Sequence, residues 1–242
     1  MSRTRADVLL VVRGLVESRA KARAAIEAGG VTADGARVMR ASDLVADGAA
    51  LHVEPAFPWV SRAGTKLAHA LDVFHVSPEG RVCLDVGAST GGFTQVLLQR
   101  GAHSVYAVDV GQGQLHPSLR DDPRVINLER TDARALTSAH LPQTPSLVVC
   151  DASFIGAAKV LAAPLSLAAE RADLIVLIKP QFEAGPKASK SGVLSEPVAR
   201  EAIAATAAAI DGLAGFTVLS VVDSPIRGGE GNLEALLFAA RR

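Results

Sequence analysis

The residues with the clearest chemical meaning form a glycine-rich turn between an apolar strand and a helix. The turn is contained in Cys83-Leu84-Asp85-Val86-Gly87-Ala88-Ser89-Thr90-Gly91-Gly92-Phe93. This order is typical of the first βα unit of a nucleotide-binding fold. A second acid, Asp109, ends the next apolar strand, 22 residues after Gly87, where a carboxylate can reach the ribose hydroxyls of a bound adenosine. The sequence therefore predicts a site for an adenosine-containing cofactor.

Details of the turn narrow the choice of cofactor. Ser89 stands where dinucleotide-binding turns carry the middle glycine, which lets the backbone approach a pyrophosphate. The Gly-Lys-Ser/Thr of a phosphate-binding loop does not occur in the sequence. Asp85, upstream of the turn, suits a cofactor with a cationic amino-acid tail and no phosphate. Asp132, after the third strand, is placed either to accept a hydrogen bond from an adenine amino group or to cap a turn or helix.

Four further charged residues are placed where they can share one crevice. Asp151 and Lys179 end the fourth and fifth predicted strands, and the carboxyl ends of parallel strands face a ligand crevice rather than the core. Glu234 begins the last strand, and Lys66 lies in the helix that opens the same domain. A fold that brings them together forms the cluster Lys66–Asp151–Lys179–Glu234.

These residues must be positioned by an alternating series of strands and helices. Apolar stretches predict strands at 81–86, 104–109, 124–128, 146–151, 173–178, 216–222 and 233–239, and helical patterns fit 61–73, 91–100, 154–169 and 196–212. Such alternation gives a parallel sheet with helices on both faces. A short loop rich in Gly and Pro joins the last two strands, so the last strand must be antiparallel. The predicted fold class is α/β: a Rossmann-like domain with a mostly parallel seven-stranded sheet, the plan of S-adenosylmethionine methyltransferases.

A smaller unit precedes this domain. We expect residues 1–54 to form a compact α+β unit, residues 55–60 a linker and residues 61–242 the Rossmann-like domain. The first unit shows two helical patterns, Ala6–Leu15 and a second that begins at Ser18, followed by short strands. Residues 1–24 carry six basic groups against two acids, which is typical of a solvated helix face and also of a surface that binds nucleic acid.

Composition excludes several classes of protein. Lys and Arg total 25, equal to Asp and Glu, and 49% of residues are hydrophobic, so global disorder is not expected. The two cysteines, Cys83 and Cys150, lie inside apolar strands and are expected to be buried and inert. No signal peptide and no apolar run long enough to span a bilayer is visible. We expect a soluble, cytoplasmic protein without a metal site.

The first unit resembles a known RNA-binding domain. The segment RADVLLVVRGLVESRAKARAAIEAGGVTADGARVMRASDLVADGAALHV is similar to the S-four-like domain first seen in a ribosomal small-subunit protein. In that family the second helix and the following turn grip the RNA backbone. The resemblance implies this role for Arg3, Arg5, Arg19, Lys21 and Arg23, through phosphate contacts that position the protein without reading sequence.

The larger domain resembles the TlyA family of ribosomal RNA 2′-O-methyltransferases, which are also named haemolysins. The motifs that carry the resemblance are WVSRAGTKL, CLDVGASTGGFTQVLL, VDVGQGQL, CDASFIG, LIKPQFEAG, GVL and GGEGNLE. The cluster of two lysines and two acids is similar to the catalytic tetrad of the FtsJ-type 2′-O-ribose methyltransferases. The resemblance implies S-adenosyl-L-methionine as cofactor, contacted by Asp85, Gly87, Ala88, Ser89, Gly91, Gly92, Phe93, Asp109, Val110, Asp132 and Ala133.

The same resemblance implies methylation of a ribose, of cytidine in the family, in small- or large-subunit ribosomal RNA within ribosomal subunits. The acceptor hydroxyl is a poor nucleophile that must be deprotonated or polarised as it attacks, and Lys179 is the candidate for that role, as base or as orienting donor. Arg62, Lys187 and Lys190 are further candidate RNA contacts, although the segment that carries the two lysines also fits an ordinary surface loop. No obligate protein partner is expected.

Three other functions remain to be weighed. A membrane-active cytolysin would agree with the family's older name, but no spanning or strongly amphipathic cationic helix supports it. A non-catalytic RNA-binding or assembly factor would have little need of the tetrad. A small-molecule methyltransferase would have little use for the N-terminal RNA-binding unit.

Overall fold

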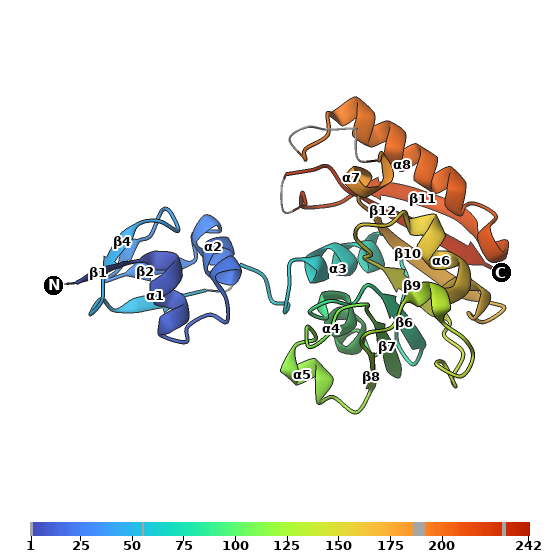
Figure 1. Cartoon of the computed structure of the whole chain (residues 1–242), viewed down its shortest axis with the longest axis horizontal. Coiled ribbons are helices and arrows are strands. Elements are labelled where there is room, and N and C mark those ends of the chain that lie inside the picture. Colours follow the sequence, from blue (N-terminus) through green and yellow to red (C-terminus); the bar gives the residue numbers. More distant parts are fainter. Residues whose placement is uncertain (1, 55, 186–191, 229–230) are drawn as a thin grey trace. The chain divides into compact units, whose positions relative to one another are not determined.

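The computed structural model describes residues 2–54, 56–185, 192–228 and 231–242. The chain divides into two compact units, residues 1–58 and residues 59–242 (Figure 1). The division falls within the predicted linker, residues 55–60.

The first unit contains two helices and two small sheets. Its elements are β1 (Arg3–Arg5), α1 (Ala6–Val12), α2 (Arg19–Glu27), β2 (Val31–Ala33), β3 (Ala36–Arg37), β4 (Leu44–Ala46) and β5 (Leu51–Val53). Strands β1 and β4 pair with each other, and β2 pairs with both β3 and β5, all antiparallel. Helix α2 begins where predicted, because the Ser18 hydroxyl caps it by accepting from the Lys21 amide.

The second unit is a seven-stranded sheet. Its strands are β6 (Val82–Val86), β7 (Ser104–Val108), β8 (Val125–Leu128), β9 (Leu147–Cys150), β10 (Ala172–Ile178), β11 (Thr217–Asp223) and β12 (Ala235–Arg241). They lie in the order β11-β12-β10-β9-β6-β7-β8. Strand β12 runs antiparallel to both of its neighbours, β10 and β11, which confirms the predicted antiparallel last strand. The other paired strands are parallel.

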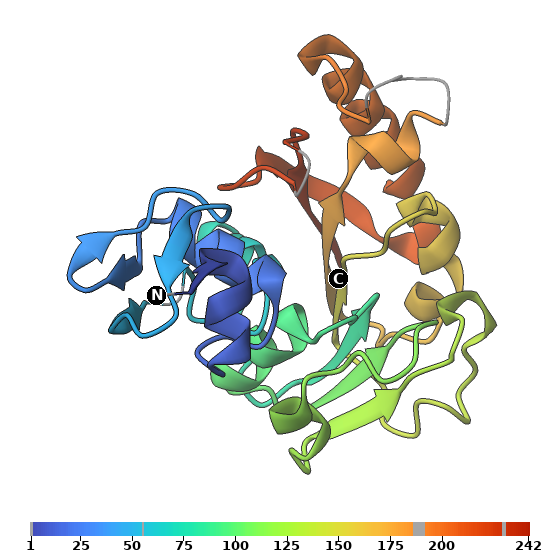
Figure 2. The same cartoon turned by 60° about the vertical axis from the view of Figure 1, so that its left-hand side comes forward.

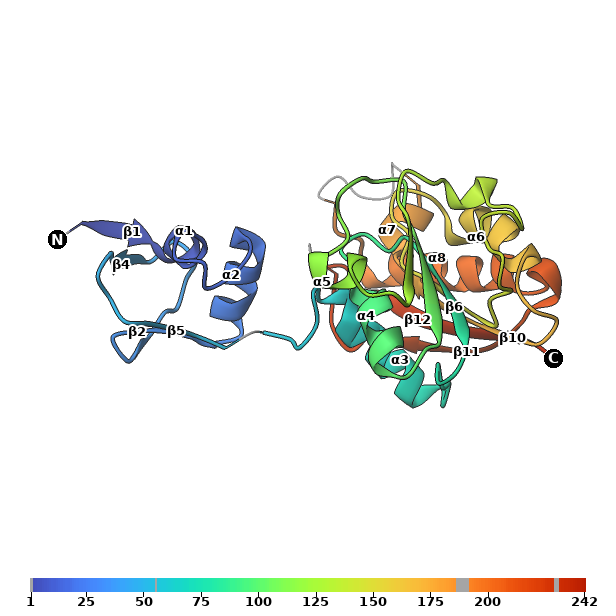
Figure 3. The same ribbon diagram turned by 90° about the horizontal axis from the view of Figure 1, so that it is seen from below.

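Helices cover both faces of this sheet (Figures 2 and 3). Helices α3 (Ala63–Val73), α4 (Gly92–Gln99) and α5 (Pro117–Arg120) pack on one face, and α6 (Ala157–Ser166) and α8 (Glu196–Ile210) pack on the other. The central strands are buried on both faces, which explains why they read as continuous apolar runs rather than alternating ones. The carboxyl ends of β6, β7, β9 and β10 therefore share one edge of the sheet, where the candidate site lies.

Several short elements are absent from the sequence prediction. They are β1, β4, α5, the short helix α7 (Pro180–Glu183) and the 3₁₀ turns η1 (Ala133–Ala135) and η2 (Leu213–Gly215). Each spans only three or four residues, which is too short to show a hydrophobic period. Helix α7 follows Lys179 directly.

Candidate active site

The glycine turn follows β6 and leads into α4. Gly87 has φ +84°, and Gly91 caps α4 with φ +92°, both in the region that favours glycine. A Cβ atom built on Gly87 would lie 3.0 Å from the Ala152 Cα. A side chain at this position would therefore displace the loop after β9, which carries Asp151.

Asp109 is held rigidly at the end of β7. One carboxylate oxygen accepts from the Ser89 amide at 2.8 Å, and the other accepts from the Gly111 amide at 2.7 Å. Each carboxylate oxygen has a second lone pair. Because Asp109 lines a pocket, those lone pairs are placed to accept from the hydroxyls of a bound ribose.

The pocket beside Asp109 has a volume of about 580 Å³. Apolar side chains of Val86, Val108, Ile155 and Val160 form part of its wall, opposite polar groups from the turns after β6, β7 and β8. We call it the cofactor pocket, because this mixture of apolar wall and converging polar groups suits a nucleoside. Six of the predicted cofactor residues line it: Gly87, Ser89, Asp109, Val110, Asp132 and Ala133.

Asp85 does not sit in this lining. Its side chain is fully buried beneath the turn, and one carboxyl oxygen accepts from the Thr94 hydroxyl at 2.7 Å. Burial raises the pKa of this carboxyl to about 7, a shift that the Thr94 hydrogen bond opposes. Asp85 therefore supports the turn from below and lines neither of the two pockets described here. Gly91, another predicted cofactor residue, also lines neither pocket.

Asp132 caps the turn η1. Its carboxylate accepts from the Arg134 amide at 2.9 Å and forms a 2.6 Å ion pair with the Arg134 guanidinium. Hydrogen bonding to Arg134 lowers the pKa of this carboxyl below its usual range. Asp132 therefore acts as a cap, which is one of the two roles considered from the sequence, and it also lines the cofactor pocket.

The four charged residues form two ion pairs at the carboxyl edge of the sheet. Lys66 of α3 pairs with Glu234, just before β12, and both side chains are buried. Lys179, after β10, pairs with Asp151, after β9, at 2.8 Å. Adjacent parallel strands bring the second pair together, because β9 and β10 are neighbours in the sheet.

A second pocket of about 460 Å³ contains all four of these residues. We call it the acceptor pocket. It adjoins the cofactor pocket, since five residues line both: Gly87, Ser89, Asp151, Ser153 and Phe154. Three other predicted cofactor residues, Ala88, Gly92 and Phe93, line only the acceptor pocket. A methyl donor in one pocket and a hydroxyl in the other would meet beside Asp151 and Lys179.

Ser153, Phe154 and Phe182 are among the residues of the acceptor pocket that the sequence prediction does not name. Phe154 is 88% exposed, with φ +68°, and its ring lies 4.9 Å from that of Phe182 in α7. Ser153 contacts Lys179 at 2.7 Å. All three lie within the motifs CDASFIG and LIKPQFEAG, so a signal was present, but only the charged members of those motifs were singled out.

The predicted RNA-contacting residues of the first unit have unequal roles. Arg5 and Arg19 both bind Asp7, whose side chain is fully buried, and their hydrogen bonds hold the pKa of Asp7 well below its usual range. Lys21, in the first turn of α2, pairs with Glu17, four residues earlier in the chain. Arg3 and Arg23 are exposed, so they are better placed to meet an external phosphate than the two arginines that anchor Asp7.

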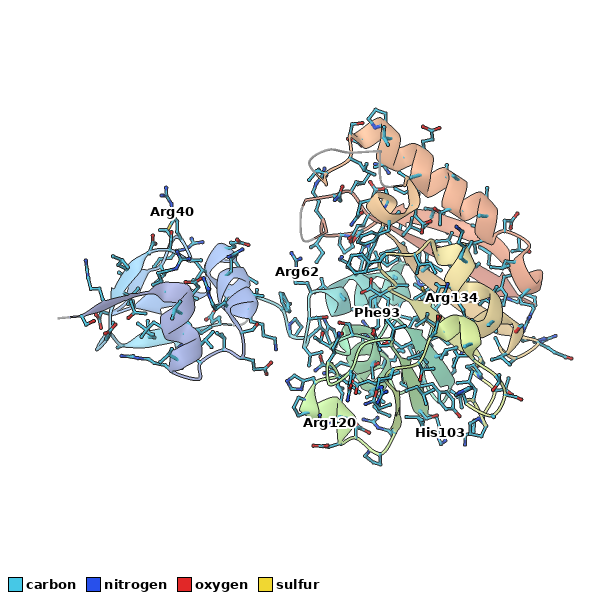
Figure 4. All side chains as sticks on the ribbon, viewed as in Figure 1. Arg40, Arg62, Phe93, His103, Arg120 and Arg134 are labelled. Atoms are coloured by element: carbon cyan, nitrogen blue, oxygen red, sulfur yellow. The ribbon has the colours of Figure 1, made fainter. Side chains whose placement is uncertain are left out.

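The remaining predicted RNA contacts belong to the second unit. Arg62 is exposed just before α3 and lines the acceptor pocket. By contrast, Phe93, a predicted cofactor residue, is buried in the interior of this unit (Figure 4). Lys187 and Lys190 lie outside the described residues. Burial raises the pKa of both cysteine thiols to about 12, which disfavours the nucleophilic thiolate near neutral pH. No helix in the described part of the chain is long and apolar enough to cross a membrane.

Comparison with known families matches both units. Residues 59–241 match the model of the FtsJ-like methyltransferase family. Residues 4–51 match the model of the S4 domain. The order of the two matches is the order of the two units in the structure.

Individual relatives match over nearly the full chain. The 16S/23S rRNA (cytidine-2′-O)-methyltransferase TlyA of Mycobacterium tuberculosis is 46% identical, over 98% of this chain and 89% of that protein. Hemolysin A of Brachyspira hyodysenteriae is 40% identical, over 96% of this chain and 98% of that protein. A solved structure of a hemolysin-named protein from Streptococcus thermophilus covers 100% of this chain and 89% of its own, with 38% identity and a TM-score of 0.77.

Proposed function

The chain belongs to the TlyA family of FtsJ-like methyltransferases, and from this premise we propose that it transfers a methyl group from S-adenosylmethionine to the ribose 2′-hydroxyl of cytidine in ribosomal RNA. The observation that carries the proposal is the junction of the two pockets at Asp151 and Ser153. Lys179 lines the acceptor pocket at this junction.

The residues present fit S-adenosylmethionine. Asp109 offers lone pairs to ribose hydroxyls, and Val86, Val108 and Val160 offer an apolar wall to an adenine ring. No phosphate-binding group is needed, in agreement with Ser89 in place of the middle glycine. When bound, the cofactor supplies a methyl group on a sulfonium leaving group.

The acceptor side requires orientation of a weak nucleophile. Lys179 and Asp151 hold each other at 2.8 Å and are largely shielded from solvent, so their positions are fixed before the substrate arrives. Lys66 and Glu234 form a second ion pair in the lining of the same pocket. We assign to Lys179 the contact with the 2′-oxygen, either as the base that takes its proton or as the donor that orients it while water takes the proton. The carbon–oxygen bond forms as the carbon–sulfur bond of the methyl donor breaks.

RNA recognition is assigned to three places in the chain. Arg3 and Arg23 of the S4 unit are exposed cations suited to backbone phosphates. Arg62 is an exposed cation that lines the acceptor pocket. The exposed ring of Phe154 offers a stacking face to a nucleobase.

The test is methyl transfer to ribosomal subunits. Purified, unmodified small and large subunits are incubated with the protein and S-adenosylmethionine carrying a labelled methyl group, and 2′-O-methylated nucleotides are then mapped. We expect label in ribosomal RNA at a cytidine ribose. Label on a base, or no label in either subunit by a protein that binds the cofactor, would contradict the proposed function.

A further inference from the structure

The side chain of Lys179 has three acceptors within reach. Its Nζ lies 2.8 Å from a carboxylate oxygen of Asp151, 3.0 Å from the Asp151 carbonyl oxygen and 2.7 Å from the Ser153 hydroxyl oxygen. An ammonium group has three N–H donors. The hydrogen bonds to the Asp151 carbonyl and the Ser153 hydroxyl use two of these donors, and the Asp151 carboxylate adds an ion pair. One N–H group therefore remains for an acceptor oxygen.

Two of the three acceptors come from a tetrad member, and the third does not. The carboxylate and carbonyl of Asp151 belong to a residue that the family resemblance already implicates. The Ser153 hydroxyl is an additional group, and it makes the shortest of the three contacts.

The sheet itself places Ser153 beside Lys179. Val176 of β10 is paired with Cys150 of β9 in parallel register. Counting three residues onward from this pair in each chain segment brings Lys179 opposite Ser153. The pairing of β9 with β10 therefore brings the two segments together, and the Lys179 ammonium contacts the Ser153 hydroxyl there.

Ser153 also stands at the place where the reacting groups must meet. It lines both the cofactor pocket and the acceptor pocket. Serine hydroxyls in loops commonly bond to nearby backbone groups, whereas this one reaches a lysine 26 residues further along the chain. A displacement of Lys179 by about 1 Å would be costly, because misplacing a reacting group by that distance can reduce the rate by roughly a hundredfold.

We propose that Ser153 is a positioning residue for Lys179, whose amino group it holds in line with the acceptor oxygen at the junction of the two pockets. This inference rests on the proposed function. It predicts that loss of the hydroxyl slows the chemical step and leaves the binding of both substrates nearly unchanged.

The experiment compares Ser153→Ala and Ser153→Thr with the wild type in steady-state methylation of ribosomal subunits. We expect Ser153→Ala to lower kcat by at least about tenfold, with the KM for subunits and the Kd for S-adenosylmethionine within about twofold. Ser153→Thr keeps the hydroxyl and should recover most of the rate. Ser166→Ala is the matched control, because its hydroxyl makes a 2.8 Å bond to the Ala163 carbonyl within α6, away from Lys179.

The outcomes separate this inference from the proposed function. A wild-type protein that methylates subunits, together with a Ser153→Ala variant of equal kcat, would overturn the role of Ser153 alone. A loss in Ser153→Ala that appears in KM or in cofactor affinity, or that Ser153→Thr does not recover, would also overturn it. A wild type that methylates neither subunit would instead count against the proposed function.

Discussion

At the scale of single residues, the buried carboxyl of Asp85 has a consequence for stability. Burial raises the pKa of this carboxyl, and the charges of Asp151 and Asp109 add to the rise. Hydrogen bonds from Thr94 oppose it. With a folded-state pKa of about 7 against an ordinary 3.8, the folded state keeps its proton where the unfolded state has lost it. The free energy of unfolding should therefore fall as pH rises from about 4 to about 7.

The variant Asp85→Asn should lack this contribution. We expect the difference in unfolding free energy between pH 5 and pH 8 to be smaller in Asp85→Asn than in the wild type, measured by urea denaturation at both values. Asp121→Asn is the control, because that side chain is 78% exposed and should change the pH dependence little. An Asp85→Asn variant with the wild-type pH dependence would show that Asp85 is ionised in the folded protein.

Residue roles were predictable where a local pattern determines them. Asp109 follows an apolar strand at a fixed spacing from Gly87, and the structure places it in the cofactor pocket. Asp85 lies only two residues before Gly87, but its side chain points beneath the turn, and spacing along the chain does not reveal which side of a strand is buried deeper. The ion pair between Arg19 and Asp7 could not be predicted from the sequence either, because it depends on how α1 and α2 pack.

At the scale of elements, α7 fastens the loop after β9 to the end of β10. Lys179 contacts Asp151 and Ser153, Phe182 packs on Phe154, and a Glu183 carboxylate oxygen accepts from the Ala157 amide at 2.8 Å. The last contact satisfies an amide in the first turn of α6, which the helix itself leaves without a partner. The loop that carries Asp151 is therefore held by α7 at its far end as well as by Lys179.

Removing that far contact should loosen the loop. We expect Glu183→Ala to cost about 1 kcal/mol of stability, the usual effect of losing a helix cap, and to lower kcat. Glu183→Gln keeps an acceptor oxygen and should behave like the wild type in both thermal unfolding and methylation. Glu201→Ala, an exposed change on α8, is the control. Equal kcat in Glu183→Ala and the wild type would show that the loop does not depend on α7.

Long elements were predicted within a few residues of their observed bounds, and short ones were missed. The apolar runs before Asp151 and Lys179 reveal β9 and β10 directly. Helix α7 has four residues and begins at Pro180, so it shows no period, and nothing in its sequence indicates that Glu183 caps another helix. The packing that positions the site is set by contacts between elements far apart in sequence.

At the scale of the whole molecule, RNA binding should depend on exposed cations of the S4 unit. We expect Arg3→Ala with Arg23→Ala to weaken binding to ribosomal RNA and to reduce the slope of log affinity against log salt by roughly two, about one for each lost phosphate contact. The measurement is a titration of binding at several salt concentrations. An unchanged slope would mean that these side chains form only a solvated surface.

Amide hydrogen exchange of Arg19→Ala shows whether a lost arginine weakens RNA binding through its charge or through unfolding of the unit. Because Arg19 pairs with the buried Asp7 at 2.7 Å, its loss should speed amide hydrogen exchange in α1 and α2. The Arg3 and Arg23 changes should leave that exchange at the wild-type rate. Faster exchange in the Arg3 and Arg23 variant would attribute its weaker binding to unfolding of the unit.

The overall fold could be predicted from the sequence, but residue spacing alone did not show that the four tetrad residues meet. Lys66 and Glu234 are 168 residues apart. They meet because α3 packs on the sheet and because β12 lies between β10 and β11, an arrangement that no local pattern shows. Charged residues at the strand ends suggested a shared crevice, the family resemblance likened the cluster to a catalytic tetrad, and strand order explains why the four residues meet.

The most direct test of the central claim is methyl transfer by Lys179→Ala. Wild type and variant are compared in single-turnover labelling of ribosomal subunits, with S-adenosylmethionine binding measured by calorimetry on the same preparations. We predict that Lys179→Ala binds the cofactor with a Kd within about twofold of the wild type, while its labelling rate falls by at least about a hundredfold. Labelling at the wild-type rate by Lys179→Ala would contradict the account, because the residue at the junction of the two pockets would then have no part in the reaction.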